Sequence, residues 1–119
     1  MYDMKYKVEY SQIVRRKMKN LKKYLTDNFG EEKAKKGIKA ITSSVKGLGD
    51  FPDKGISVAE MFGIDTEYYY LYVNHNYMFY YLIGDRVIVA EMFDEREDFM
   101  YKLFGISTES EESTDYWGE

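Results

Sequence analysis

Apolar and polar residues alternate at residues 5–10, where Tyr6, Val8 and Tyr10 share one face. A period of two predicts a half-buried strand. Ser11 follows, a residue type that favours the N-cap of a helix. From there the apolar residues recur at steps of three and four, at Val14, Met18, Leu21, Leu25 and Phe29. The change of period at Ser11 therefore predicts a strand that leads directly into a helix.

A second helix is predicted after Gly30, because glycine commonly ends helices. Glu31 and Glu32 come next, and negative charge is favourable in the first turn of a helix. The apolar residues of this second helix are again three or four positions apart, at Ala34, Ile38, Ile41 and Val45. Since only a short turn separates the two helices, we expect an antiparallel hairpin whose apolar side covers another layer.

Four segments rich in Tyr, Val, Ile and Phe follow a loop at residues 47–55. They are Ile56–Met61, Glu67–Val73, Tyr77–Ile83 and Arg86–Phe93. The short turns at residues 74–76 and 84–85 allow only antiparallel neighbours, and residues 98–104 are expected to form a short helix. The predicted fold is α+β: an N-terminal strand, a two-helix hairpin, an antiparallel meander of three to four strands and a short C-terminal helix.

The length of 119 residues suits one domain, which we place at residues 1–107. Residues 108–119 hold five Asp/Glu and no Lys/Arg, and we expect them to form a disordered acidic tail. The chain has no cysteine, which excludes disulfides, thiol catalysis and cysteine-based zinc sites. We expect no metal and no cofactor. No apolar stretch approaches a membrane span or a signal core, so we expect a cytoplasmic protein with no membrane partner.

The net charge of −4 conceals a division along the chain. Residues 1–46 carry thirteen Lys/Arg and five Asp/Glu, whereas residues 47–119 carry four and sixteen. Most of the positive charge therefore lies on the predicted helices, where a basic surface would attract a nucleic acid or an acidic protein. The candidate binding residues are those of the first helix: Arg15, Arg16, Lys19, Lys22 and Lys23.

The order of elements and several short phrases resemble the RelE/ParE superfamily of toxins from bacterial type II toxin–antitoxin systems. The similarity extends over about residues 5–105. Its phrases are Tyr6–Ser11, Leu25–Gly30 with Ala34, Leu48–Gly55, Tyr77–Tyr81, Val87–Ala90, Arg96–Asp98 and Leu103–Phe104. No single phrase is diagnostic, because each serves the fold, but their order together is moderately specific.

The resemblance implies a toxin that inhibits growth, with roles such as plasmid stabilization, and that a cognate antitoxin holds inactive. ParE-like members poison DNA gyrase, whereas RelE-like members cleave messenger RNA on the ribosome. Antitoxins of this family are commonly acidic, so the resemblance places the antitoxin on the basic helices. The expected partners are therefore an antitoxin and either gyrase or the ribosome with its messenger.

The resemblance also indicates which residues would cleave RNA, a reaction that needs an acid, a base and cations around the phosphate. Arg96 matches the arginine that the family has near the end of its last strand. The position of another family arginine falls on Tyr69, and Arg86 is the only Lys or Arg within residues 56–93. Arg96, Tyr69 and Arg86 are the catalytic candidates. A position where the family often has histidine holds Asp94.

Tyr69 and Asp94 stand where RNA-cleaving members of the family have arginine and histidine. Because these two cations are missing, we favour ParE-like gyrase inhibition over ribosome-dependent RNA cleavage. Whether the protein is an enzyme stays open. A second alternative is an inert homologue that serves only as a protein-binding module. His75 lies in a polar turn without an evident partner and is expected to be a plain surface residue. The many tyrosines of residues 68–81 could stack nucleic-acid bases, but the alternation of a strand places half of them in the core.

Overall fold

The computed structural model describes residues 5–106, in which β1 (Lys7–Tyr10) leads directly into α1 (Gln12–Phe29). Ser11 makes this junction as predicted, because its Oγ accepts a hydrogen bond from the backbone N–H of Val14 at 3.1 Å. The same hydroxyl donates to the carbonyl of Ala90 at 3.0 Å and so ties the start of α1 to the sheet. The acidic tail expected at residues 108–119 lies outside the described residues.

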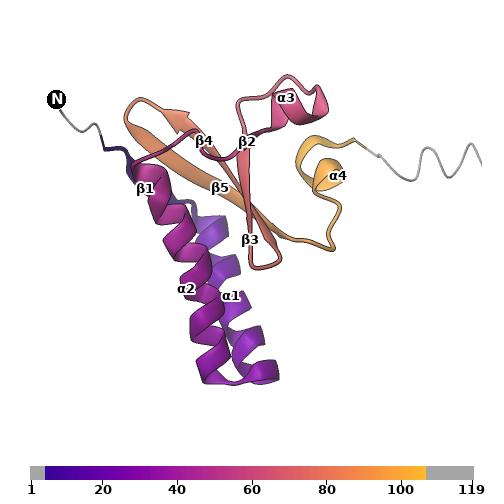
Figure 1. The fold of residues 1–119 in the computed structure, drawn as a ribbon. Helices are drawn as coiled ribbons and strands as arrows, with labels where there is room; N and C mark the ends of the chain where they lie inside the picture. Colours follow the sequence, from indigo (N-terminus) through magenta and orange to yellow (C-terminus); the bar gives the residue numbers. More distant parts are fainter. Residues whose placement is uncertain (1–4, 107–119) are drawn as a thin grey trace, which may run out of the picture.

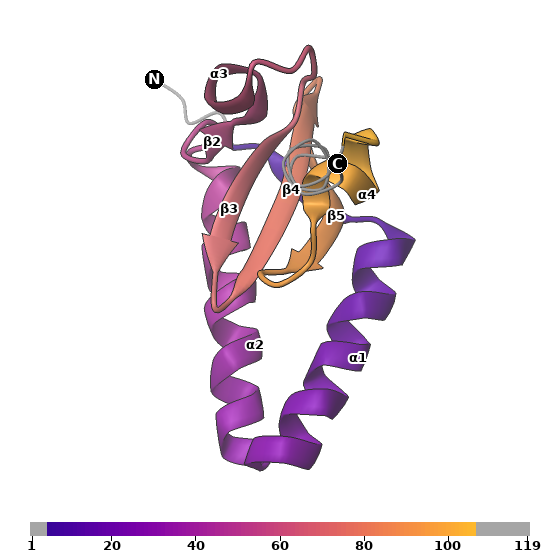
Figure 2. The ribbon, with the colours of Figure 1, turned by 90° about the vertical axis from the view of Figure 1, so that its right-hand side faces the viewer.

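The hairpin of α1 and α2 (Glu31–Lys46) turns at Gly30, where φ is 94°. That value lies in the left-handed region, which suits glycine. Figure 2 shows the two helices close together at this turn and farther apart where they meet the sheet. A short 3₁₀ helix, η1 (Gly47–Gly49), ends α2.

The sheet has five strands in the order β1-β5-β4-β3-β2 (Figure 1). β3 (Tyr69–Val73), β4 (Asn76–Ile83) and β5 (Arg86–Asp94) form the predicted antiparallel meander. β1 joins this meander in parallel beside β5. The α+β class and the order of elements are confirmed, and α4 (Phe99–Phe104) is the expected short helix.

The strand predicted at Ile56–Met61 is wrong for most of its length. Only β2 (Ile56–Ser57) pairs with β3, and Val58–Phe62 forms the helix α3. Ser57 explains the change, because its Oγ accepts from the N–H of Glu60 at 3.2 Å and caps the helix. An apolar segment of six residues cannot by its pattern alone be distinguished as strand or helix.

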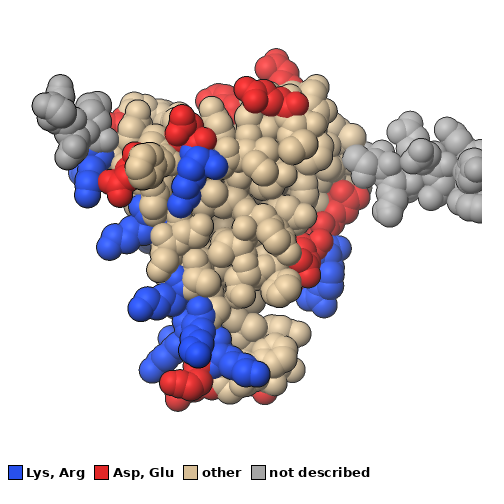
Figure 3. Space-filling view, viewed as in Figure 1, with Lys and Arg blue, Asp and Glu red and all other residues tan. Residues whose placement is uncertain are grey.

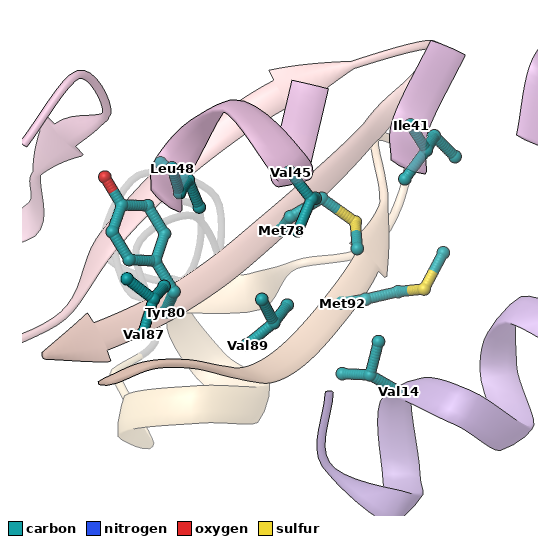
Figure 4. Packing of buried hydrophobic residues seen from close by; sticks show 9 residues of the cluster. All are labelled: Val14, Ile41, Val45, Leu48, Met78, Tyr80, Val87, Val89 and Met92. Carbon is teal, nitrogen blue, oxygen red and sulfur yellow. The ribbon is translucent and has the colours of Figure 1, made fainter. Parts of the chain in front are cut away.

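The two faces of the sheet have separate cores. The helices cover one face of the sheet. The space between the helices and the sheet is filled by nine buried residues (Figure 4): Val14, Ile41, Val45, Leu48, Met78, Tyr80, Val87, Val89 and Met92. The outer face, turned away from the helices, holds Val58, Tyr70, Phe79 and Phe93, with residues of α4 packed against them.

An irregularity in the pairing of β4 with β5 decides which side chains reach which core. Tyr80 pairs with Val89 and Phe79 with Glu91, so Ala90 is an extra residue in β5. A bulge of this kind shifts the alternation of side chains by one. It therefore allows Met92 to pack under the helices while Phe93 faces the opposite core.

Candidate functional site

The basic face, defined as Arg15, Arg16, Lys19, Lys22 and Lys23 of α1, is exposed. Within residues 5–106, Lys23 is the one member that forms an ion pair, with Asp27 at 2.8 Å. Figure 3 shows that Lys and Arg gather over the helices, whereas Asp and Glu lie mainly above and beside the strands. The structure thus concentrates on one surface the positive charge that the sequence places in one half of the chain.

Lys17 belongs to the same helix but does not contribute to the basic face. Its Nζ donates to Glu91 Oε1 at 3.1 Å and to the carbonyl of Met92 at 2.9 Å. The ammonium also lies 4.5 Å from the centre of the Phe93 ring, a cation–π contact. This lysine therefore holds α1 on β5 and gives a hydrogen-bond partner to the carbonyl of Met92 at the edge of the sheet.

A groove of about 290 Å³, which we call the interhelix groove, runs between α1 and α2. It lies on the basic face, since three of its lining residues are Arg15, Lys19 and Lys22. The others are Tyr10, Met18, Ile38 and Thr42, all partly buried. A basic rim around an apolar floor can take an acidic ligand that also has apolar side chains.

The three catalytic candidates do not converge in space. Arg86 begins β5 and Arg96 follows its end, so the length of the strand separates them by about 25 Å. Arg86 Nη1 lies 3.4 Å from Glu9 Oε1. Tyr69 is half-buried against the core under the helices and stacks on Tyr80, with ring centres 5.5 Å apart.

Arg96 is held by a neighbouring carboxylate. Its Nε donates to Asp94 Oδ1 at 2.8 Å and its Nη2 to Asp94 Oδ2 at 3.2 Å. This pair raises the pKa of Arg96 and lowers the pKa of Asp94. The acidic residue that occupies the family's histidine position therefore neutralises the candidate arginine.

His75 has a partner that the sequence did not reveal. Its Nδ1 lies 3.0 Å from Glu95 Oε2, and the hydroxyl of Tyr72 donates to the other oxygen of the same carboxylate. The Tyr72 hydrogen bond is the main cause that lowers the pKa of Glu95, and the same bond raises the pKa of Tyr72. Glu95 lies twenty residues beyond His75, and only the pairing of β4 with β5 brings the two together.

The turn at His75 is held in the left-handed region, with φ of 50° at Asn74 and 68° at His75. Positive φ at both central residues is typical of a tight two-residue hairpin. The carbonyl of His75 also accepts from the N–H of Glu95 at 2.8 Å. The turn and the end of β5 therefore form one rigid corner.

This corner borders the hairpin-end pocket, a cavity of about 560 Å³ between the end of the helices and the sheet. Its charged lining is mixed and consists of Lys33, Lys36, His75, Asp94, Glu95 and Arg96. Tyr24 and Phe29 give it an aromatic wall. Its acidic groups are bound by Arg96, Tyr72 and His75, whereas Lys33 and Lys36 form no ion pair with another described residue.

The outer face of the sheet is aromatic and acidic. β3 and β4 contain no charged residue, and their outward side chains include Tyr70, Tyr77 and Phe79, which contact one another. A second cavity, of about 590 Å³, lies on this face and is lined in part by Asp65 and Glu67. Tyr70 and Phe79 are buried under α4, so the charged part of this face is the cavity with Asp65 and Glu67, where two carboxylates and no Lys or Arg disfavour a phosphate. Within the described part of the chain, no group of three His, Asp or Glu residues could hold a metal ion.

The helices of the described region include none that is long and apolar enough to span a membrane. The chain matches no protein-family model and no curated protein.

Eight chains of solved structures match. One of them is described as "Chromosomal ParDE TA system from P. aeruginosa". Its TM-score to this chain is 0.64 at 13% sequence identity, and the alignment covers 76% of this chain and 97% of the other. At this identity the comparison shows a shared fold, which extends over nearly the whole of the similar chain.

Proposed function

We propose that this protein is the toxin of a toxin–antitoxin pair and acts in the cytoplasm. The similar chain belongs to a ParDE system, and this chain reproduces nearly all of its fold. The phrases that resemble the RelE/ParE superfamily extend from β1 to α4. The resemblance of the phrases rests on residue types, whereas the similarity to the solved structure rests on backbone geometry. The proposal therefore has two kinds of support.

The toxin acts by binding a macromolecular target, with DNA gyrase favoured over the ribosome and its messenger. The observation that carries this preference is the separation of the candidate cations. Arg86 and Arg96 lie at opposite ends of β5, and each faces a carboxylate. RNA cleavage needs several cations around one phosphate, so this arrangement favours inhibition by binding.

The cognate antitoxin covers the basic face of α1. Support comes from the charge of the two helices, where residues 12–46 carry eleven Lys/Arg and three Asp/Glu. Four of the five residues of the basic face form no ion pair with another described residue, so they remain available to an acidic partner. Complementary charge accelerates association and favours the correct partner.

Induced expression in a bacterial host tests the toxin function. Growth should arrest, and co-expression of the antitoxin encoded by the adjacent gene should restore it. Normal growth at good soluble expression would contradict the proposal and would instead favour an inert homologue that only binds protein.

Two assays separate the targets. The purified toxin should inhibit DNA supercoiling by gyrase and leave messenger RNA intact on programmed ribosomes. Cleavage of the messenger in the ribosomal A site would overturn the preference and identify an endoribonuclease. In that case Arg96→Ala should reduce cleavage strongly and His75→Ala should not, as the similarity of Arg96 to the family arginine implies.

A further inference from the structure

The acidic segment, residues 108–119, matches the interhelix groove in both charge and apolar content. It carries five Asp/Glu and no Lys/Arg. Within it, Tyr116 and Trp117 stand between Asp115 and Glu119. The surface that would complement a segment of this composition is apolar at its centre and positive around it.

The interhelix groove has this chemistry. Its floor contains the partly buried side chains of Met18 and Ile38. Around them stand Arg15, Lys19 and Lys22, which are exposed and form no ion pair with any residue between 5 and 106. At about 290 Å³ the groove is large enough to admit an indole ring, and burying an indole against Met and Ile is favourable.

We propose that residues 108–119 dock in the interhelix groove of their own chain. Trp117 occupies the apolar floor, and Asp115 and Glu119 lie against the cations of the rim. The other two cations of the basic face, Arg16 and Lys23, lie outside the groove and contribute only long-range attraction.

The length of the connection permits docking within one chain. The described chain ends at Ile106, just after α4, which packs on the outer face of the sheet. The groove lies beyond the helices on the other side of the sheet. The sheet and helix layers are together about 20 Å thick, whereas the eleven residues 107–117 span up to about 36 Å when extended. The extended segment exceeds this depth by about 16 Å, which is the length left for the path around an edge of the sheet.

The docking itself is independent of the proposed function. Its effect on antitoxin binding rests on that function. A segment in the groove occupies three of the five residues of the basic face, so an acidic antitoxin must displace it in order to bind there. The acidic segment then acts as a weak internal competitor, which an antitoxin with more acidic or apolar contacts replaces.

The fluorescence of Trp117 in the full-length protein tests the proposal, because Trp117 is the only tryptophan of the chain. In the native protein its emission should be blue-shifted relative to the protein in denaturant, and acrylamide should quench it less. The Lys19→Glu/Lys22→Glu variant should show a red shift and stronger quenching, since both changes place negative charge opposite Asp115 and Glu119.

Lys33→Glu/Lys36→Glu is the matched control. It makes the same change of charge on the same hairpin, but in the hairpin-end pocket, and it should leave the emission of Trp117 unchanged. Both pairs of lysines are exposed, so the variants should fold, which circular dichroism can verify.

Three results would overturn the proposal. The first is native emission equal to that in denaturant. The second is an equal red shift in the two variants, which would show a general effect of charge without a specific groove. The third is a shift that depends on protein concentration, which would show that the segment docks on a second molecule.

Discussion

Tyr80 connects the meander to the loop that precedes it. Its hydroxyl donates to the carbonyl of Pro52 at 2.8 Å and accepts from the N–H of Gly55 at 3.0 Å. The side chain is completely buried, and this burial raises its pKa to about 12. One residue therefore satisfies two backbone groups of a loop that has little regular structure of its own.

This raised pKa predicts a loss of stability at alkaline pH. Between about pH 10 and pH 12 the unfolded chain releases the phenolic proton while the folded chain retains it, so unfolding becomes easier as the pH rises. The full effect is about 2–3 kcal/mol. Denaturant titrations at several pH values measure it.

Tyr80→Phe tests the assignment, because it should flatten this part of the pH dependence. It should also cost about 1–3 kcal/mol at neutral pH, since Pro52 and Gly55 lose their partner. Tyr101→Phe is the control, as Tyr101 is exposed and should change neither quantity. A Tyr80→Phe protein with the pH dependence of the wild type would contradict the prediction.

A second prediction at the scale of the residue concerns Gly55. A Cβ atom at this position would lie 2.8 Å from the carbonyl oxygen of Tyr70 and closer still to the Tyr80 hydroxyl. Because neither group can move freely, Gly55→Ala should destabilise the protein by about 1–3 kcal/mol in chemical denaturation.

Gly47→Ala is the matched control for this crowding. A Cβ atom there would meet only the end of the flexible Lys54 side chain, and the backbone φ of −62° suits any residue. Its stability should stay within about 0.5 kcal/mol of the wild type. An equal loss in the two variants would show that the crowding at Gly55 is not the cause.

At the scale of the element, α1 is fixed to β5 by polar contacts as well as by its apolar side. Ser11 and Lys17 donate to the carbonyls of Ala90 and Met92, which lie beyond the last pairing of β1 with β5 at Val89. The first turns of the helix thus cover a part of the strand edge that would otherwise remain open, and an open edge invites association with other chains.

Lys17→Met should therefore lower the free energy of unfolding by about 1–2 kcal/mol, because Glu91 and the Met92 carbonyl lose their donor. Lys19→Met, on the same helix but exposed, should change it by less than about 0.5 kcal/mol. Thermal and denaturant unfolding of both variants measure the difference. Similar stabilities would show that the apolar side of α1 alone holds it on the sheet.

At the scale of the whole molecule, charge is divided between two layers. The helices are basic, whereas residues 47–107 carry eleven Asp/Glu and four Lys/Arg. Figure 3 shows Lys and Arg mainly over the helices and Asp and Glu mainly above and beside the strands, so the two kinds of charge lie on different parts of the surface. A polyanion or an acidic protein is attracted to the helices.

If the proposed antitoxin binds the basic face, this division predicts the kinetics of its binding. Arg15→Glu/Arg16→Glu should slow association about tenfold at low salt, and the difference from the wild type should shrink as salt screens the charges. Lys46→Glu/Lys54→Glu, away from the basic face, should have a much smaller effect. Surface plasmon resonance at several salt concentrations measures this, and equal slowing in the two variants would place the antitoxin elsewhere.

The elements that local pattern determines were predictable. The change of period at Ser11 and the glycine at residue 30 define the helical hairpin, and the short turns define the meander. The helix within residues 56–61 was not predictable, because a short apolar run suits strand and helix equally. The cap that Ser57 forms decides for a helix. The parallel pairing of β1 beside β5 is also beyond local pattern, since the two strands are nearly eighty residues apart.

The sequence by itself determined the fold class, the division of charge and the basic residues of α1, because these depend on periodicity and composition. Only the tertiary structure decided where the candidate residues lie relative to one another. It placed Arg86 and Arg96 at opposite ends of one strand, Tyr69 beneath the helices and His75 beside Glu95. These positions depend on strand register and on the bulge at Ala90. Both are set by the pairing of whole strands, which brings together residues that are far apart in the chain.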